Sequence, residues 1–216
     1  MALYSFFVLP ESNISVTGTR VFNGNTIKKS LDGLNQGDGS HLENEFLTIN
    51  SINAVEVFVD DAGTETFFAD NDSGQELAFD VTIDGVLYTA GTRIEAEYEF
   101  TLRDPNTNIE YRAITINISN SSPAYATNEA IAFVGAVPPP NVSLEIVNPI
   151  EGPPNSGGNA IDAGDIVACF CAGTQIATDL GDRLVENLEV GQKVKRPDGS
   201  FATLRRVFMT TLTTAQ

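Results

Sequence analysis

Short runs of alternating apolar and polar residues recur along the chain as far as residue 134. A period of two residues places successive side chains on opposite faces of a strand, so each run predicts a half-buried β-strand. Clusters of Gly, Asp, Asn and Pro separate the runs at intervals typical of an antiparallel sandwich or barrel. No segment carries a helical stripe of apolar positions. The pattern predicts an all-β fold, an antiparallel β-sandwich, with strands near 46–49, 54–59, 86–89, 94–102, 111–118 and 130–134.

Local signals add three details to this pattern. Asp84-Gly85 separates two short apolar runs and favours a tight two-residue hairpin. Residues 1–10 lack the basic region and the cleavage site of a signal peptide, and their short apolar run predicts a strand. Residues 142–147 predict one more strand before Pro and Gly become frequent.

Composition divides the chain into three parts. We expect an acidic β module over residues 1–149, a Pro/Gly-rich linker over 150–167 and a separate segment over 168–216. Pro and Gly remove backbone donors and regular structure, so the linker is expected to be exposed. Residues 1–168 carry 24 acidic and 6 basic side chains, whereas residues 169–216 carry 5 and 6. The two ends of the chain therefore look like different modules.

The net charge limits the partners of the protein. A formal charge of −17 and a pI near 4.2 argue against binding to nucleic acid or to an anionic membrane surface. No run approaches the roughly 18 apolar residues of a membrane span, so none is expected. The composition suits an extracellular or cell- or particle-surface protein, exported without an N-terminal signal peptide. Its partners would be further copies of itself or another surface protein.

Two acidic loops flank a short apolar stretch of the β module. Carboxylate oxygens on loops are the ligands that Ca²⁺ prefers, so Ca²⁺ is the cation expected here. The spacing after Asp70 departs from that of an EF-hand loop, and such clusters also occur as plain solvated turns. The sequence leaves both alternatives open: solvated turns, or a Ca²⁺ site made of Asp60, Asp61, Asp70 and Asp72.

Other polar residues offer weaker signals. Glu95, Glu97 and Glu99 share one face of a strand by period two. Paired carboxylates can perform acid/base chemistry, but three in succession favour the solvent face of an antiparallel sheet. The single histidine, His41, follows a Gly-rich turn, and we expect it to be a surface or locally hydrogen-bonded residue. The sequence has no nucleophile-elbow serine, phosphate-binding loop or His/Cys metal set.

Both cysteines lie in one short segment, two residues apart, which is too close for an ordinary disulfide. The segment and the residues after it read Cys169-Phe170-x-x-Gly173-Thr174-x-Ile176-Ala177-Thr178, then Val185-Glu186-Asn187-Leu188-x-Val190-Gly191-Gln192-x-Val194, then Asp198-Gly199. In this order and spacing, residues 169–216 resemble the opening part of a Hint (hedgehog/intein) domain. The acidic part before it resembles the β leader modules of marine alphaproteobacterial Hint proteins.

The resemblance implies self-cleavage. In the family, the first Cys attacks the carbonyl of the preceding residue and converts that peptide bond to a thioester by an N–S acyl shift. Carried onto this sequence, Cys169 is the nucleophile and Ala168–Cys169 is the scissile bond, with no cofactor required. Cys171 stands where relatives often carry a small residue, so the spacing favours Cys169. A free Cys is also commonly a buried apolar residue, which leaves a purely structural role open for both.

The sequence departs from the family pattern in two places. The family's later Thr-x-x-His block, whose His assists protonation of the scissile nitrogen, has no counterpart, because His41 lies upstream. The sequence ends in Thr213-Thr214-Ala215-Gln216 rather than in the Asn and nucleophile of splicing members. We therefore expect a Hint-family autoprocessing precursor, truncated or inactive as given and at most capable of a single turnover, that releases or transfers the β module. The alternative is a secreted or particle-associated structural or adhesive β protein, self-assembling or Ca²⁺-binding, with a vestigial Hint tail.

Overall fold

A computed structural model describes residues 2–33, 38–63, 66–118, 127–166, 175–195, 199–204 and 207 of the chain. The chain forms two compact units, which we call the N-terminal unit (Met1–Ala168) and the C-terminal unit (Cys169–Gln216). Each unit is described by itself.

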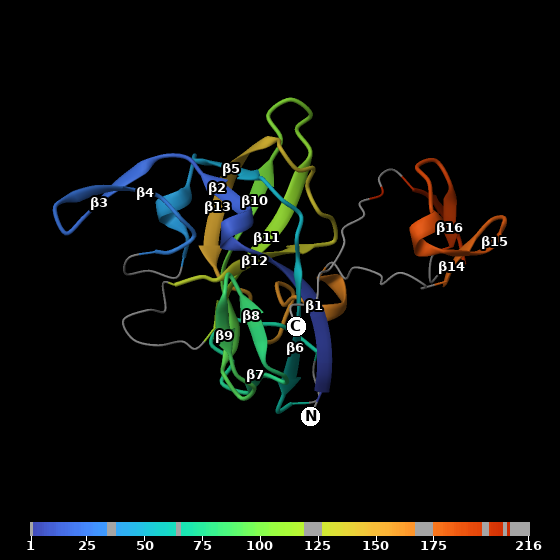
Figure 1. The fold of residues 1–216 in the computed structure, drawn as a ribbon, viewed down its shortest axis with the longest axis horizontal. Helices are drawn as coiled ribbons and strands as arrows, with labels where there is room; N and C mark the ends of the chain where they lie inside the picture. The colour runs from blue at the N-terminus through green and yellow to red at the C-terminus, as the bar shows by residue number, and fades with distance from the viewer. Residues whose placement is uncertain are drawn as a thin grey trace. The chain divides into compact units, whose positions relative to one another are not determined.

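One nine-stranded antiparallel sheet dominates the N-terminal unit (Figure 1). In spatial order its strands are β2 (Ile14–Val16), β5 (Phe46–Ile49), β13 (Ser143–Glu151), β10 (Ile94–Arg103), β11 (Glu110–Ile118), β12 (Ala130–Val134), β1 (Ala2–Pro10), β6 (Val55–Asp61) and β7 (Gln75–Leu77). Two hairpins lie beside it, β3 (Thr19–Phe22) with β4 (Asn25–Lys28) and β8 (Val81–Ile83) with β9 (Val86–Tyr88). The predicted all-β, antiparallel class is confirmed.

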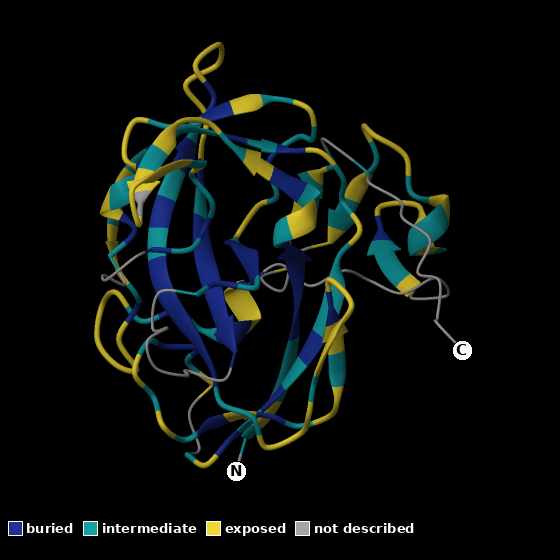
Figure 2. Cartoon of the chain, turned by 60° about the vertical axis from the view of Figure 1, so that its left-hand side comes forward, coloured by how far each residue is buried: buried dark blue, intermediate teal, exposed yellow. Residues whose placement is uncertain are grey.

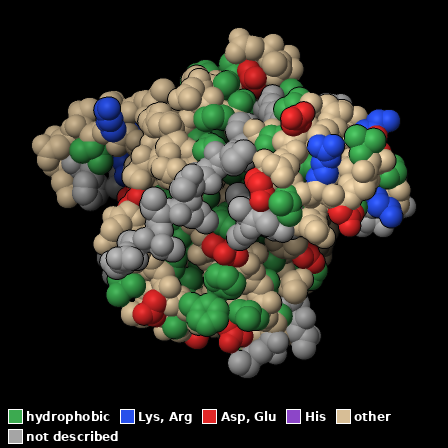
Figure 3. Space-filling view, turned by 45° about the vertical axis from the view of Figure 1, so that its right-hand side comes forward, with side chains coloured by type: hydrophobic (Ala, Val, Ile, Leu, Met, Phe, Trp, Pro, Cys, Tyr) green, Lys and Arg blue, Asp and Glu red, His purple; other side chains and the backbone are tan. Residues whose placement is uncertain are grey.

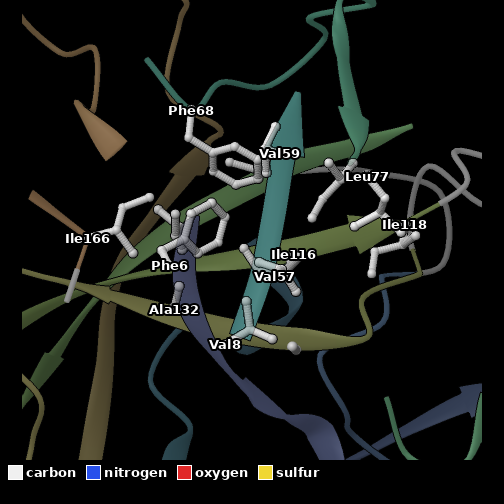
Figure 4. Close-up of a cluster of buried hydrophobic side chains, with 14 of the residues drawn as sticks. Phe6, Val8, Val57, Val59, Phe68, Leu77, Ile116, Ile118, Ala132 and Ile166 are labelled. Carbon is white, nitrogen blue, oxygen red and sulfur yellow. The ribbon is translucent and has the colours of Figure 1, made fainter. Parts of the chain in front are cut away.

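β1 folds this sheet into a sandwich because it changes partner along its length. Residues 2–8 pair with β6, whereas Leu9 and Pro10 pair with β12. A strand that passes from one layer to the other brings the inner faces of the two layers together. The inter-sheet core lies between them and includes Phe6 of β1 and Phe68, whose ring centroids are 4.7 Å apart (Figure 4).

A second core lies on the opposite face of the central strands. In β11, Ile114 and Ile116 enter the inter-sheet core, while Tyr111 and Ala113 enter this second core. Leu42, from the 3-10 turn η2 (Ser40–Leu42), packs in the second core. The central strands are therefore buried on both faces, and Figure 2 shows the long central strands in dark blue along most of their length.

A β-bulge in β10 decides which side chains face which core. Ala96 pairs with Ile116 and Glu99 with Ile114, so two residues of β10 stand opposite one residue of β11. The extra residue reverses the alternation. Ala96 lies in the inter-sheet core, whereas Tyr98 lies in the second core.

The three glutamates of β10 do not form a solvent face, and this expectation was wrong. Glu95 is 1% exposed and Glu97 is 4% exposed. Glu99 is half-buried and forms an ion pair with Arg112, with 2.5 Å between Oε2 and Nη2. Alternating polar residues face solvent only when one face of the strand is open to water. Both faces of β10 are covered, so its glutamates are buried or half-buried.

The β8–β9 hairpin has the two-residue turn that the sequence predicted at Asp84-Gly85. Asp84 and Gly85 both have positive φ, 50° and 80°, as a two-residue type I′ turn requires. The predicted hairpin is confirmed. The strand expected at 142–147 is also present, and β13 continues it as far as Glu151.

The stretch expected to be an exposed linker has a different arrangement in its described part. Residues 154–159 are exposed, but Ile161, Ala163 and Ile166 are at most 3% exposed. We call residues 161–166 the strap; it contains the 3-10 turn η3 (Ala163–Asp165). Ile161 and Ile166 explain why this part is not exposed, because both bury apolar surface in the inter-sheet core.

The C-terminal unit contains a small four-stranded sheet in the order β15, β14, β16, β17. Its strands are β14 (Gln175–Thr178), β15 (Gly181–Leu184), β16 (Lys193–Lys195) and β17 (Phe201–Thr203), with the 3-10 turn η4 (Val185–Asn187) between β15 and β16. Among the described residues of this unit, no apolar side chain is fully buried, and Leu180 is 75% exposed. The described residues of this unit therefore contribute little hydrophobic stabilisation.

No described helix has both the length and the apolar character needed to cross a bilayer.

Candidate functional site

The predicted scissile bond joins the two compact units. Ala168 and Cys169, and also Cys171, lie outside the described residues. The nearest described residues are Ile166 on the N-terminal side and Gln175 on the C-terminal side. The structure therefore defines the anchors of the junction, and the chemistry of the cysteine rests on the sequence.

The upstream anchor is the strap. Two backbone hydrogen bonds attach it to the loop before β7: Phe68 N–H donates to the Ile161 carbonyl at 2.9 Å, and Ala163 N–H donates to the Thr66 carbonyl at 2.7 Å. At its other end Ile166 forms an antiparallel bridge with Val134 of β12. β12 has room for this bridge because β1 pairs with it only at Leu9 and Pro10, opposite Ile131 and Ala130, while residues 2–8 pair with β6.

The downstream anchor is the β14–β15 hairpin. Thr178 closes its turn, because its Oγ1 donates to the Gly181 carbonyl at 2.5 Å and accepts a hydrogen bond from Leu180 N–H at 3.2 Å. Gly181 has φ 99°, a left-handed conformation that favours glycine. Thr178 also pairs with Val194 of β16, which ties the hairpin to the rest of the small sheet. The segments 176–178 and 185–194 of the Hint-like pattern thus form one sheet with its turns.

The first two candidate Ca²⁺ ligands point away from each other. Asp60 and Asp61 are neighbours in β6, and successive side chains of a strand lie on opposite faces. Asp61 is 1% exposed; its Oδ1 accepts a hydrogen bond from Gly63 N–H at 2.9 Å, and its Oδ2 accepts one from Gln75 Nε2 at 3.2 Å. These bonds account for its burial. Asp60 is half-buried on the other face of the strand.

The other two candidates also occupy different environments. Asp72 Oδ1 accepts a hydrogen bond from Gly74 N–H at 2.8 Å and so closes a local turn. Asp70 instead joins a cluster with glutamates of β10 and β13. In the part of the chain that the structure describes, no three His, Cys, Asp or Glu side chains are grouped to hold a metal ion. The Ca²⁺ site stays a prediction that this geometry does not support.

The acidic cluster collects four carboxyl groups from three segments: Asp70, Glu95, Glu97 and Glu151. Glu151 lies close enough to Asp70 for its negative charge to contribute to the raised pKa of Asp70. Arg93 contributes a cation, with 2.6 Å between its Nη2 and Glu95 Oε2.

The surroundings of the cluster raise the pKa values of Asp70, Glu95 and Glu97. Burial, followed by the negative charges of Glu95 and Glu151, raises the pKa of Asp70 to about 7. Burial, followed by the charges of Asp70, Glu95 and Glu151, raises the pKa of Glu97 to about 8. Burial also raises the pKa of Glu95, although Arg93 opposes the shift. Desolvation and like charges both disfavour ionised carboxylates.

Close backbone packing keeps the cluster compact. A Cβ on Gly152 would lie 2.1 Å from the Ala96 carbonyl oxygen and 2.5 Å from Asp70 Cβ. Asp70 N–H donates to the Pro153 carbonyl at 2.8 Å, which fastens the start of the 152–160 stretch to the same place. Sequence reasoning missed this cluster, because its carboxyl groups come from three segments that are far apart in the chain.

His41 has a structural environment. Its Nε2 lies 3.2 Å from the Ser30 carbonyl oxygen, and its ring packs edge-on against Tyr98 with 6.2 Å between centroids. Burial is the main reason that its pKa lies below the ordinary value. The structure places this histidine within the N-terminal unit, in agreement with a locally hydrogen-bonded residue.

Fold and junction together define an all-β protein in which an acidic sandwich precedes a small β unit with a cysteine at its first residue. The model of the Hint domain family matches the C-terminal segment, residues 168–216. No curated protein and no solved structure matches the chain.

Proposed function

We propose that the protein is a Hint-family autoprocessing precursor in which Cys169 cleaves the Ala168–Cys169 bond and so releases or transfers the N-terminal unit. One observation carries the proposal. The family match begins at residue 168, and the boundary between the two compact units, set by packing alone, falls between residues 168 and 169. A bond at which one folded unit ends and the Hint segment begins is where such a reaction would separate two intact products.

The chemical step needs only groups of the chain. The Cys169 thiol attacks the Ala168 carbonyl carbon, the C–N bond breaks, and a thioester forms between Ala168 and Sγ. The proton lost by the thiol is taken up by the amine nitrogen that leaves. A nucleophile such as water, a thiol or an amine then attacks the thioester and frees the Cys169 thiol.

The residue types available in the given Hint segment set the rate expected of residues 1–216. Residues 170–216 contain no histidine, and His41 contacts the Ser30 carbonyl within the N-terminal unit. General acid catalysis by a positioned group typically contributes roughly 10²–10⁴-fold, so its absence predicts slow spontaneous cleavage. A strong nucleophile in solution should then be needed to draw the thioester equilibrium toward products.

The test uses the full chain and both cysteines. Incubation with hydroxylamine should produce two fragments, one ending at Ala168 and one beginning at Cys169. The Cys169→Ala variant should remain intact. The Cys171→Ala variant is the matched control, since it loses a thiol two residues away, and it should cleave as the wild type does.

Two results would contradict the proposal. Full-length chain that persists in hydroxylamine, at a pH and concentration that cleave an authentic thioester, would exclude the N–S shift. If Cys171→Ala abolished cleavage and Cys169→Ala did not change it, the nucleophile would be Cys171 and not Cys169.

A second candidate function is self-assembly of an exported, surface-associated protein, and the β8–β9 hairpin favours it. Val86 and Leu87 are 52% and 60% exposed, close in sequence to Phe79 at 57%. Hydrophobic side chains at the surface are visible as green atoms in Figure 3. Exposed apolar groups of this kind gain free energy when a second copy covers them.

Native mass measurement tests self-assembly. The wild-type chain should form oligomers that Leu87→Asp disrupts. Val21→Asp is the matched control because Val21 is at least as exposed as Leu87, at 69% against 60%, and lies on the separate β3–β4 hairpin. A monomeric wild-type chain, unchanged by added Ca²⁺, would exclude both assembly and the adhesive, Ca²⁺-dependent role.

A further inference from the structure

The layer formed by β1, β6 and β7 has an inner and an outer face. Phe6 of β1, Val59 of β6 and Leu77 of β7 point into the inter-sheet core (Figure 4). Because successive side chains of a strand alternate between its two faces, the residues next to them point outward. Leu3, on the outward side of β1, is 62% exposed. The outer face of this layer is therefore open to solvent at this strand.

The strand register places acidic side chains on the outer face. Leu3 pairs with Asp60, and Asp60 pairs with Glu76, so these residues form one row across β1, β6 and β7. Directly paired residues of an antiparallel ladder project from the same face. Glu76 is exposed and Asp60 is half-buried. The row thus places two carboxylates beside an exposed leucine.

The neighbouring row adds aromatic surface. Phe58 lies two residues before Asp60 and so projects from the same face of β6. Its ring meets the Phe79 ring edge-on, with 5.4 Å between the centroids. Ala78 N–H donates to the Phe58 carbonyl at 2.8 Å, which holds Phe79 beside β6. Phe79 is nevertheless 57% exposed. We call the following residues the outer patch: Leu3, Phe58, Asp60, Glu76 and Phe79.

The charges of the N-terminal unit decide what kind of partner fits the outer patch. Both charged residues of the patch are acidic. Of the six basic side chains in residues 1–168, four form ion pairs with glutamates of the same unit, and a fifth, Arg20, donates to the Asp32 carbonyl. The sixth is Lys28 of the β3–β4 hairpin. Two copies joined through this patch would bring carboxylates against carboxylates, whereas a basic partner would bring opposite charges together.

We propose that the outer patch binds a segment of another protein that carries Lys or Arg beside apolar side chains. The cations of that segment lie next to Asp60 and Glu76, and its apolar side chains cover Leu3 and Phe79. Hydrophobic contact supplies affinity, while the opposite charges select the partner and speed its approach. This inference is independent of the proposed cleavage, and it concerns the face of β1, β6 and β7 rather than the β8–β9 hairpin.

The experiment measures the binding of labelled peptides to the full chain by fluorescence anisotropy. The probe is a short peptide of alternating Lys and Leu, and two control peptides replace every Leu by Ser or every Lys by Glu. The probe should bind, and its Kd should rise with salt because salt screens charges at the surface. Both control peptides should bind at least about fivefold more weakly, since each lacks one of the two kinds of contact.

Variants of the apolar residues locate the binding. Leu3→Ser and Phe79→Ser should each raise the Kd of the probe about fivefold or more, because a covered apolar side chain contributes at least that factor. Both positions are exposed, so these variants should keep the wild-type midpoint of urea unfolding. Val21→Ser is the matched control: Val21 is 69% exposed on the separate β3–β4 hairpin, and its variant should bind as wild type does.

Variants of the acidic residues test the charge. Glu76→Gln should raise the Kd of the probe and reduce its dependence on salt. Glu43→Gln removes an equal charge at an exposed position outside the outer patch and should leave both unchanged.

Three results would overturn the inference. Absence of binding would do so directly. Equal weakening by Val21→Ser and Phe79→Ser, or equal affinity for the peptide of Lys and Ser, would show a general attraction to an acidic protein. Wild-type oligomers that Leu3→Ser and Phe79→Ser disperse would assign the outer patch to a second copy of this chain.

Discussion

Replacing Glu97 by Gln should make the N-terminal unit more stable at alkaline pH and leave its stability at acidic pH nearly unchanged. Glu97 is 4% exposed and shares the acidic cluster with Asp70, Glu95 and Glu151, with Arg93 as a cation of the cluster. Its pKa is raised from 4.5 to about 8. The folded state therefore holds a proton that the unfolded chain has lost, throughout the range between these two values.

The sign and size follow from this difference. A carboxyl group with a raised pKa in the folded state contributes stability below the unfolded value, and that contribution is lost as pH rises toward the folded value. For one group the loss is about 1.36 kcal/mol for each pH unit inside the window. Between pH 5 and pH 7 this gives about 2.5 kcal/mol. Coupling to Asp70 and partial hydration reduce the expected effect to about 1.5–2.5 kcal/mol.

Urea unfolding followed by circular dichroism at pH 5, 6, 7 and 8 measures the effect. Wild type should lose stability steadily across this range, and Glu97→Gln should lose distinctly less. Glu99→Gln is the matched control: it lies on the same strand but pairs with Arg112 outside the cluster, so it should keep the wild-type slope. Equal slopes for wild type and Glu97→Gln, or stability that rises with pH in this range, would refute the reasoning.

Three further predictions concern packing and the independence of the units. Gly152→Ala should destabilise the N-terminal unit by about 1–3 kcal/mol in urea unfolding, since the added methyl meets backbone, whereas Gly158→Ala, with nothing within 4 Å, should be neutral. Phe6→Ala should cost about 3–5 kcal/mol, since Phe6 is fully buried, and Phe79→Ala, at an exposed position, should cost less than about 0.5 kcal/mol by the same measurement. Hydrogen exchange should be faster throughout the C-terminal unit than in the central strands of the N-terminal unit; equal protection would show that the small sheet has stabilisation not visible in its described residues.

The strands of the fold could be predicted where one local signal decided the structure. Alternation located β6, β10, β11 and β12, and Asp84-Gly85 specified its hairpin because positive φ at both turn residues is a local requirement. Composition and motif change together near residue 168, where the sequence predicts that the Hint-like segment begins; the two compact units divide between residues 168 and 169.

Features that depend on contacts between distant residues could not be predicted. Glu95 and Glu97 alternate like solvent-facing residues, and their burial requires a second layer over β10 and a bulge that no local pattern marks. The sequence predicted a linker at the strap because Pro and Gly surround it. Its attachment to the N-terminal unit depends on a bridge between Ile166 and the distant Val134. In both places tertiary packing overrides local propensity.

Mass spectrometry of the hydroxylamine product tests the central claim most directly. The account predicts an N-terminal fragment that ends at Ala168 as a hydroxamate, together with a complementary fragment that begins with a free Cys169 and is absent from the Cys169→Ala variant. A full-length chain without cleavage, or a fragment that ends at any residue other than Ala168, would contradict it.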